Sequence, residues 1–228
     1  MRKEMKIVNV TSAKKNPDNS IELTIVNPLE GGKEINKYAA IRGGISWPTT
    51  KAPAYFCIVG QEYTESQGKE DSVSPGTRIL LAEYVSDSLS LSGFYNRIID
   101  LSEQMLCRGF YLFIEDIRYD DGNLHDLQKA DQMRGGNISL RDAYDKNNFL
   151  LGISRIRESI DKGELIIPED SIVYSQLQNI TREDLENKPE NIFSAINALR
   201  HVLGSFYRDP PRNHYHTSRR PPPDWRCV

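Results

Sequence analysis

Cysteine is scarce in this sequence, and its placement argues against two kinds of stabilising site. The 228 residues include three cysteines, Cys57, Cys107 and Cys227. None belongs to a CxxC pair or to the Cys/His spacing of a zinc site, and an odd number cannot be fully paired within one chain. We therefore expect no disulfide framework and no zinc, and a reducing compartment, the cytoplasm.

Long apolar runs and an excess of one charge are missing as well. The opening MRKEMKIVNV carries basic residues without an apolar stretch behind them, and the apolar runs elsewhere have the length of strands. We expect neither a secretion signal nor a membrane partner. The 29 basic and 32 acidic residues leave a formal net charge of −3, so a surface that binds nucleic acid has to be local.

Three catalytic or nucleotide-binding motifs are absent. The sequence has no GxxxxGK[ST] phosphate loop, no G-x-S-x-G nucleophile elbow and no GxGxxG strand–helix junction. His214 and His216 lie in a segment rich in proline and arginine without nearby acids, which does not favour a metal site. P-loop ATPases, α/β-hydrolases and dinucleotide-binding enzymes are therefore not indicated.

Strand patterns dominate the first part of the chain. Runs rich in aromatic and β-branched residues are centred on Ile41, Ile58 and Leu80, and their short polar connections predict an antiparallel meander. Before them, the run from Ile21 to Val26 predicts a strand in an N-terminal arm or hairpin, residues 1–36. Residues 37–207 are expected to form the main α/β domain.

Apolar residues at i, i+4, i+7 and i+11 spacing predict three helices, from Phe94 to Met105, from Phe149 to Ile160 and from Ile192 to Leu203. Gly109 is expected to end the first, Lys162 and Gly163 the second, and Gly204 and Pro210 the third.

Shorter strands are expected between and behind these helices. GFYLFIED, ending at Glu115 and Asp116, is apolar on both faces, as in an interior parallel strand, and it predicts a right-handed β-helix-β crossover before the loop IRYDDGN. ISLRDAY and ELIIPED each predict a brief strand.

Residues 208–228 are rich in proline and arginine and cannot form a packed core. They predict either an extended tail or an arm that contacts DNA or a partner through Arg212, Arg219 and Arg220.

The predicted order of elements resembles the RNase H-like fold, in which three antiparallel strands precede parallel strands and a closing helix. More specifically, DKNNFLLGISRIRESIDKGELII and NIFSAINALRHVLGSF resemble segments of the C-terminal nuclease domain of phage terminase large subunits. The resemblance covers about residues 38–206. It implies a role in phage DNA packaging, with double-stranded DNA or packaging proteins, such as a portal and a separate ATPase chain, as partners.

The resemblance also implies a site for two Mg²⁺ or Mn²⁺ ions held by several carboxylates. Matched to the family pattern, Arg42 stands at the first acid, Glu115 or Asp116 at the second, and Ser194 and Asn197 at the acids of the closing helix. Only the second position keeps a carboxylate. In this reading the guanidinium of Arg42 pairs with Glu115 in place of the ions, no cofactor is needed, and the domain is catalytically degenerate.

Two alternatives stay open. An active Mg²⁺- or Mn²⁺-dependent endonuclease that cuts concatemeric phage DNA would use Glu115 with acids from a different set, among Asp116, Asp120, Asp121, Asp126, Asp142 and Asp145. An α/β assembly protein unrelated to terminases would need none of them.

Overall fold

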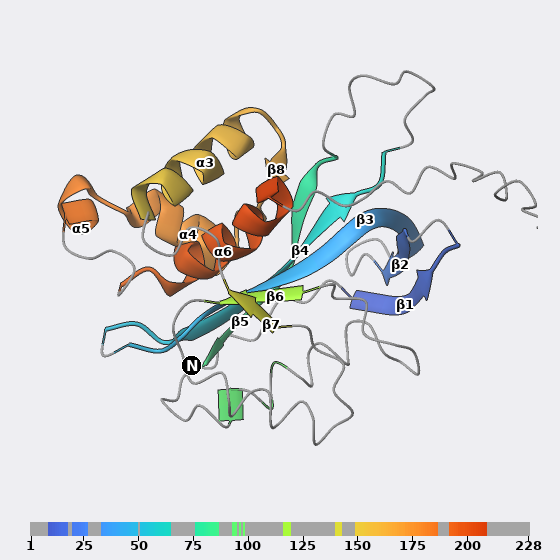
Figure 1. The fold of residues 1–228 in the computed structure, drawn as a ribbon, viewed down its shortest axis with the longest axis horizontal. Coiled ribbons are helices and arrows are strands. Elements are labelled where there is room, and N and C mark those ends of the chain that lie inside the picture. Colours follow the sequence, from blue (N-terminus) through green and yellow to red (C-terminus); the bar gives the residue numbers. More distant parts are fainter. Residues whose placement is uncertain are drawn as a thin grey trace, which may run out of the picture.

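The computed structural model describes residues 9–17, 20–26, 33–49, 51–64, 76–86, 93–94, 96, 98, 116–119, 140–142, 149–186 and 192–208. Within these ranges, one mixed sheet of eight strands carries a layer of helices (Figure 1).

The centre of the sheet is the predicted antiparallel meander. Strands β3 (Lys33–Ser46), β4 (Ala54–Glu62) and β5 (Arg78–Ser86) pair in chain order, each antiparallel to the next. This confirms the predicted meander. The side chains of β4 are buried on both faces of the strand, as expected for a strand at the covered centre of a sheet.

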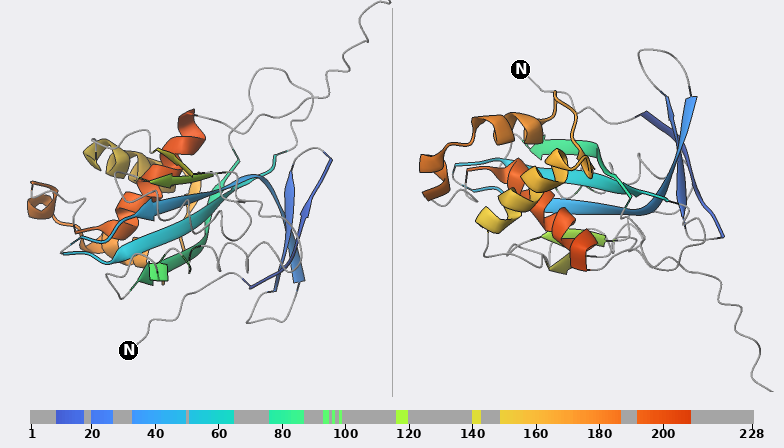
Figure 2. Two further views of the ribbon diagram at one scale, coloured as in Figure 1. Left: turned by 60° about the horizontal axis from the view of Figure 1, so that its bottom comes forward. Right: turned by 90° about the horizontal axis from the view of Figure 1, so that it is seen from above.

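The N-terminal region forms a hairpin. Strands β1 (Asn9–Lys15) and β2 (Ile21–Val26) are antiparallel, and β2 pairs with the first half of β3, from Lys33 to Tyr38. Figure 2 shows this hairpin standing apart from the helices, at one end of the sheet. Strand β3 runs without interruption through position 36, so the hairpin and the main sheet share this strand. The expected boundary between an N-terminal segment, residues 1–36, and the main domain remains a prediction.

Beyond Tyr38 the free edge of β3 is taken by parallel strands. Arg42 to Gly44 pair with β6 (Asp116–Tyr119), and β6 pairs in parallel with β7 (Leu140–Asp142). The core order is therefore β5-β4-β3-β6-β7, antiparallel in its first half and parallel in its second. This is the predicted RNase H-like arrangement, and the fold class is confirmed.

The position of the middle parallel strand differs from the prediction. GFYLFIED was expected to be the strand, but residues 109–115 lie outside the described part, and β6 begins at Asp116 and continues through Tyr119. The expectation of a loop from Ile117 to Tyr119 is wrong, because β-branched and aromatic residues suit a strand even where a charged residue separates them. The brief strand expected in ISLRDAY is confirmed as β7.

Two of the predicted helices are described in full. Helix α3 (Phe149–Asp161) is confirmed, and Gly163 follows it with a φ of 69°, the left-handed conformation that favours glycine. Next comes the predicted strand stub, β8 (Leu165–Ile166), which is parallel to β5. Of the first predicted helix, Gly93, Phe94, Asn96 and Ile98 are helical, and the rest lies outside the described residues.

The closing helix α6 (Ser194–Arg208) is longer than predicted. Pro210 and Gly204 were both expected to end it; the helix stops at Arg208, two residues before Pro210, but it does not end at Gly204. The next two residues, Ser205 and Phe206, are buried against the sheet and the helix continues through them, so tertiary packing outweighs the glycine penalty of about 1 kcal/mol.

Two short helices were not predicted, α4 (Ile172–Asn179) and α5 (Arg182–Glu186). Each has a capping signal in the sequence. The Ser171 hydroxyl accepts a hydrogen bond from the backbone N–H of Tyr174, and Thr181 and Asp184 bond each other's backbone N–H reciprocally. Of the described helices, none has both the length and the apolar character that crossing a membrane requires.

The two faces of the sheet pack against different elements. Helix α6 lies along β3 and β4 on one face, with α3 and α4 against it (Figure 1). On the opposite face, Phe94 contacts Trp47 edge to face and stacks on Tyr84, with ring centroids 6.3 Å and 6.0 Å apart. The candidate site lies on the face that α6 covers.

Candidate functional site

Alternate residues of β3 place Arg42, Gly44 and Ser46 on the face of the sheet that α6 covers. A Cβ atom added to Gly44 would lie 2.1 Å from the backbone oxygen of Ala198. The helix backbone therefore rests directly on the strand at Gly44. Arg42 and Ser46, on either side of this contact, are 4 % and 2 % exposed.

The first turn of α6 is held by a side chain of α4. The Oε1 atom of Gln176 accepts hydrogen bonds from the backbone N–H groups of Ala195, at 3.0 Å, and Ile196, at 3.2 Å. This amide satisfies donors that every helix N-terminus leaves free. It also fixes how α6 enters the structure, and with it the positions of the next polar side chains.

Polar residues form a stripe on the buried side of α6. They recur at i, i+3, i+7 and i+11, and all four are buried: Ser194, Asn197, His201 and Ser205. Polar side chains that are removed from water need hydrogen-bond partners, so a stripe of this kind has to be matched by the surface it covers. For two of the four the match comes from β3: Asn197 bonds Ser46, and Ser205 bonds Arg42.

The Ser46–Asn197 site consists of Ser46, Asn197 and Arg200. The Nδ2 group of Asn197 donates to the Ser46 hydroxyl at 3.2 Å, and its Oδ1 atom accepts from Nε of Arg200 at 2.7 Å. Because a guanidinium can only donate, the second bond fixes which end of the amide faces Ser46. The site thus joins the last residue of β3 to the closing helix.

Arg200 is enclosed by α3. Its guanidinium carbon lies 5.3 Å from the ring centre of Phe149, in cation–π contact, and a Cβ atom on Gly152 would lie 2.8 Å from its Cδ atom. The absence of a side chain at Gly152 provides the room for the arginine stem. Arg200 is 5 % exposed, so this positive charge lies almost entirely inside the protein.

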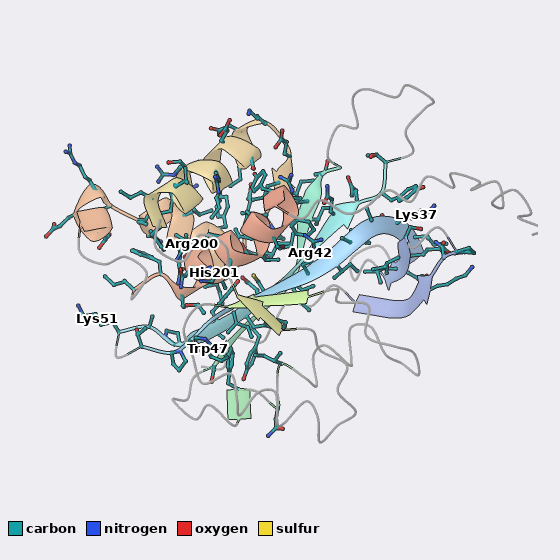
Figure 3. The ribbon with its side chains drawn as sticks, in the orientation of Figure 1. Lys37, Arg42, Trp47, Lys51, Arg200 and His201 are labelled. Carbon is teal, nitrogen blue, oxygen red and sulfur yellow. The ribbon has the colours of Figure 1, made fainter. Side chains whose placement is uncertain are left out.

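Arg42 contacts α6 nearer the C-terminal end of the helix than the Ser46–Asn197 site does. Its Nη1 atom donates to the Ser205 hydroxyl at 3.4 Å, and its guanidinium carbon lies 4.8 Å from the ring centre of Phe206. Ser205 is eight residues from Asn197, or about 12 Å along a helix. Figure 3 shows Arg42 and Arg200 at separate places along α6. The structure therefore brings Asn197 together with Ser46, and Arg42 together with Ser205.

The strands bring one predicted acid position next to Arg42. Asp116, the first residue of β6, is the Cα partner of Arg42 in the parallel register. Only its backbone is described. Glu115 and the tail arginines Arg212, Arg219 and Arg220 lie outside the described residues.

Among the described residues, the side chains around Asn197 do not fit a pair of divalent cations. Mg²⁺ and Mn²⁺ prefer carboxylate oxygens, whereas the groups here are hydroxyls, an amide, an imidazole and a buried guanidinium. Within the described part of the chain, no cluster of three or more His, Cys, Asp or Glu residues could hold a metal ion.

Ser46 was not identified from the sequence. The family pattern was matched with Arg42 at the first acid position, four residues earlier on the same face of β3. The available signal was the position of Ser46 at the end of the strand, directly after Gly43, Gly44 and Ile45, where a strand delivers side chains to the edge of a site.

Cys57 of β4 lies on the same face but is not a reactive thiol. It pairs with Gly44 in the register and is fully buried. Burial, together with the charge of Glu83, holds the pKa of the Cys57 thiol well above its usual range. The neutral thiol acts as a small apolar group.

Comparisons with known proteins find similarity in structure rather than in sequence. No protein-family model matches the chain, and no curated protein matches its sequence. Among solved structures, the large terminase nuclease from thermophilic phage G20c, with bound zinc, is 12% identical at a TM-score of 0.46, over 86% of this chain and 92% of that one. The g2p large terminase nuclease domain from bacteriophage SPP1, with bound Mn, is 15% identical at a TM-score of 0.45, over 75% and 86%. Both belong to the family that the sequence resembles.

Proposed function

We propose that this chain is a terminase nuclease-type domain that acts in phage DNA packaging, in the host cytoplasm, by binding DNA or other packaging proteins rather than by hydrolysing DNA. The proposal rests on the RNase H-like strand order, the terminase-like segments of the sequence, and the side chains at the end of β3. Its mechanism is scaffolding.

The observation that carries the proposal is the double hydrogen bond of Asn197. Its amide is engaged by the Ser46 hydroxyl on one side and by the buried guanidinium of Arg200 on the other. A divalent ion placed there would have to displace both bonds and would be repelled by the guanidinium in a medium of low dielectric constant. In this proposal Ser46, rather than Arg42, occupies the first acid position, and Ser194 and Asn197 occupy those of the closing helix.

A plasmid-nicking assay with Mn²⁺ tests the loss of hydrolysis. We expect no metal-dependent cutting by the native chain. Glu169→Ala is the control, because it removes an equal charge elsewhere. If the native chain cuts DNA, and the cutting disappears in Glu115→Ala but persists in Glu169→Ala, the chain is an active endonuclease and the proposal is overturned.

Salt-dependent retention on duplex DNA tests the binding role. Neutralising the tail with Arg212→Gln, Arg219→Gln and Arg220→Gln should weaken retention and reduce its dependence on salt, because each lost phosphate contact removes about one unit of slope. Binding that is unchanged by these substitutions would exclude the tail from the DNA contact. A native chain that binds neither DNA nor a packaging protein would contradict the proposed function.

A further inference from the structure

Strand β5 carries a buried carboxylate on the face of the sheet that α6 covers. Glu83 is 8% exposed and is the Cα partner of Cys57 in β4. Its Oε2 atom accepts a hydrogen bond from the Tyr55 hydroxyl at 2.5 Å. A buried charge is costly unless it is well hydrogen-bonded, and one hydroxyl does not satisfy two carboxylate oxygens.

The second partner of Glu83 is the N-terminus of α4. The backbone N–H of Ile172, the first residue of this helix, donates to both carboxylate oxygens, at 2.8 Å and 3.0 Å. A carboxylate is favoured there, because the first N–H groups of a helix lack partners within it and form the positive end of its dipole. Glu83 therefore fixes the start of α4 to the sheet.

One turn further on, α4 holds α6, against which it lies (Figure 1). Gln176 is four residues after Ile172, on the same side of the helix. Its Oε1 atom accepts the hydrogen bonds from the backbone N–H groups of Ala195 and Ile196. A shift of α4 would therefore carry this acceptor away from the first turn of α6.

The contacts form a closed circuit around the Ser46–Asn197 site. Asn197 belongs to the same turn of α6 and donates to Ser46 of β3. Ser46 is the Cα partner of Tyr55, and Tyr55 donates to Glu83. The site is thus framed by the sheet on one side and by α4 on the other, and Glu83 joins the two.

Helix α4 makes a small apolar contact with the core. It has eight residues, of which Val173 is buried, and Ile172 and Leu177 are half-buried. A helix of this length is marginal on its own, and an element with little buried surface opens at a lower free energy than the whole domain. Its polar links to Glu83 and α6 therefore have a large share in holding it.

We propose that Glu83 is the positioning residue of the Ser46–Asn197 site and that it acts through α4. The carboxylate sets where α4 begins, α4 places Gln176, and Gln176 fixes the turn of α6 that carries Asn197. Reach is decisive in this arrangement, because the N–H of Ile172 needs an acceptor at hydrogen-bond distance.

Two substitutions separate reach from charge. Glu83→Asp keeps the charge but withdraws the carboxylate by one methylene, whereas Glu83→Gln keeps the reach and one acceptor oxygen without the charge. Amide hydrogen exchange is measured by NMR. In Glu83→Asp, exchange at Ala195 and Ile196 should rise about tenfold relative to Leu199, and in Glu83→Gln by about threefold or less.

Leu199, one turn further along α6, distinguishes positioning from a general loss of stability. A variant that merely destabilises the domain accelerates exchange at all three residues alike, and that result for Glu83→Asp would overturn the proposal. So would equal effects of Glu83→Asp and Glu83→Gln. Glu164→Asp is the control, because it shortens a carboxylate whose partner is Arg78 of β5, and it should leave the ratio unchanged.

Gln176→Ala tests the route. Alone, it should raise exchange at Ala195 and Ile196 about tenfold, because it removes their acceptor. Adding Glu83→Asp should then raise it by less than about twofold, since the link is already broken. Effects that multiply in the double variant would show that Glu83 acts by another route, and would overturn the proposal.

The side-chain amide signals of Asn197 test whether the site itself responds. They should shift in Glu83→Asp and in Gln176→Ala and stay close to their native positions in Glu83→Gln. Native signals in Glu83→Asp would overturn the assignment of Glu83 to this site. Neither DNA binding nor hydrolysis enters these measurements, so their outcome leaves the proposed function untouched.

Discussion

Gly44 of β3 and Ala198 of α6 are in backbone contact, so closely that a single added carbon on Gly44 would lie 2.1 Å from the Ala198 oxygen. This contact sets the distance between the helix and the sheet. The hydrogen bond between Ser46 and Asn197 and that between Arg42 and Ser205 both depend on it, because they lie on either side of it.

Gly44→Ala should therefore lower the free energy of unfolding by about 3 kcal/mol, since backbone rather than a movable side chain opposes the new methyl group. Urea unfolding measures the effect. Gly163→Ala is the comparison: open space surrounds this residue, and its cost of about 1 kcal/mol comes from the positive φ alone. Equal losses for the two variants would contradict the close contact.

Asn197→Ala should cost about 2 kcal/mol of stability, because it removes an acceptor from the buried guanidinium of Arg200 and the donor to Ser46. Asn197→Asp should cost less. The carboxylate still accepts from Arg200, and the Ser46 hydroxyl can rotate to donate to it. Chemical unfolding of both variants checks the order, and a more damaging aspartate would argue against the assigned bonds.

Restoring acids should create metal binding only in the register that we propose, with Ser46 at the first acid position. A variant with Ser46→Asp, Ser194→Asp and Asn197→Asp is expected to be stabilised by Mn²⁺, by about 2.7 kcal/mol at 100 times the dissociation constant. The matched variant carries Arg42→Asp in place of Ser46→Asp and should show no such gain. Calorimetry and thermal unfolding distinguish them. If only the variant with Arg42→Asp were stabilised by Mn²⁺, Arg42 rather than Ser46 would occupy the first acid position.

Because Tyr38 is buried, we expect the free energy of unfolding to fall in alkali. Tyr38 is 1% exposed, and burial, followed by the charge of Glu62, raises its pKa to about 12 from the ordinary 10.0. The unfolded chain therefore releases this proton first. The contribution of the neutral tyrosine is complete below pH 10 and is lost as the pH rises towards 12, by up to about 3 kcal/mol.

Tyr38→Phe should make the dependence of unfolding free energy on pH less steep in this interval, and the buried Tyr55 and Cys57, whose pKa values are also raised, should keep part of it. A curve for Tyr38→Phe that parallels the native one would show that another group is responsible.

The elements predicted most accurately from the sequence are those with a long apolar repeat whose side chains are buried. The strands around Ile41, Ile58 and Leu80 and the helix from Phe149 were found because apolar side chains repeat on the faces that the structure buries. Helices α4 and α5 were missed because they are short and α5 has little buried surface, although Ser171 and the Thr181–Asp184 pair mark their starts. Capping residues carry that information when periodicity does not.

The candidate site was predicted only in part. Asn197 was identified from the pattern of the closing helix, but its partner Ser46 was not. A family pattern that has lost its acids no longer fixes the register, since Arg42 and Ser46 share a face of β3 and lie on either side of Gly43 and Gly44. Only the position of α6 across β3 distinguishes them.

Strand β3 is hydrogen-bonded along both edges, to β4 on one side and to β2 and then β6 on the other. Because successive side chains point to opposite faces, adding or deleting one residue between Tyr38 and Arg42 would turn Arg42, Gly44 and Ser46 away from α6 together. Relatives of this protein should therefore vary freely in the length of the connections around β3, while the strand itself keeps the same number of residues.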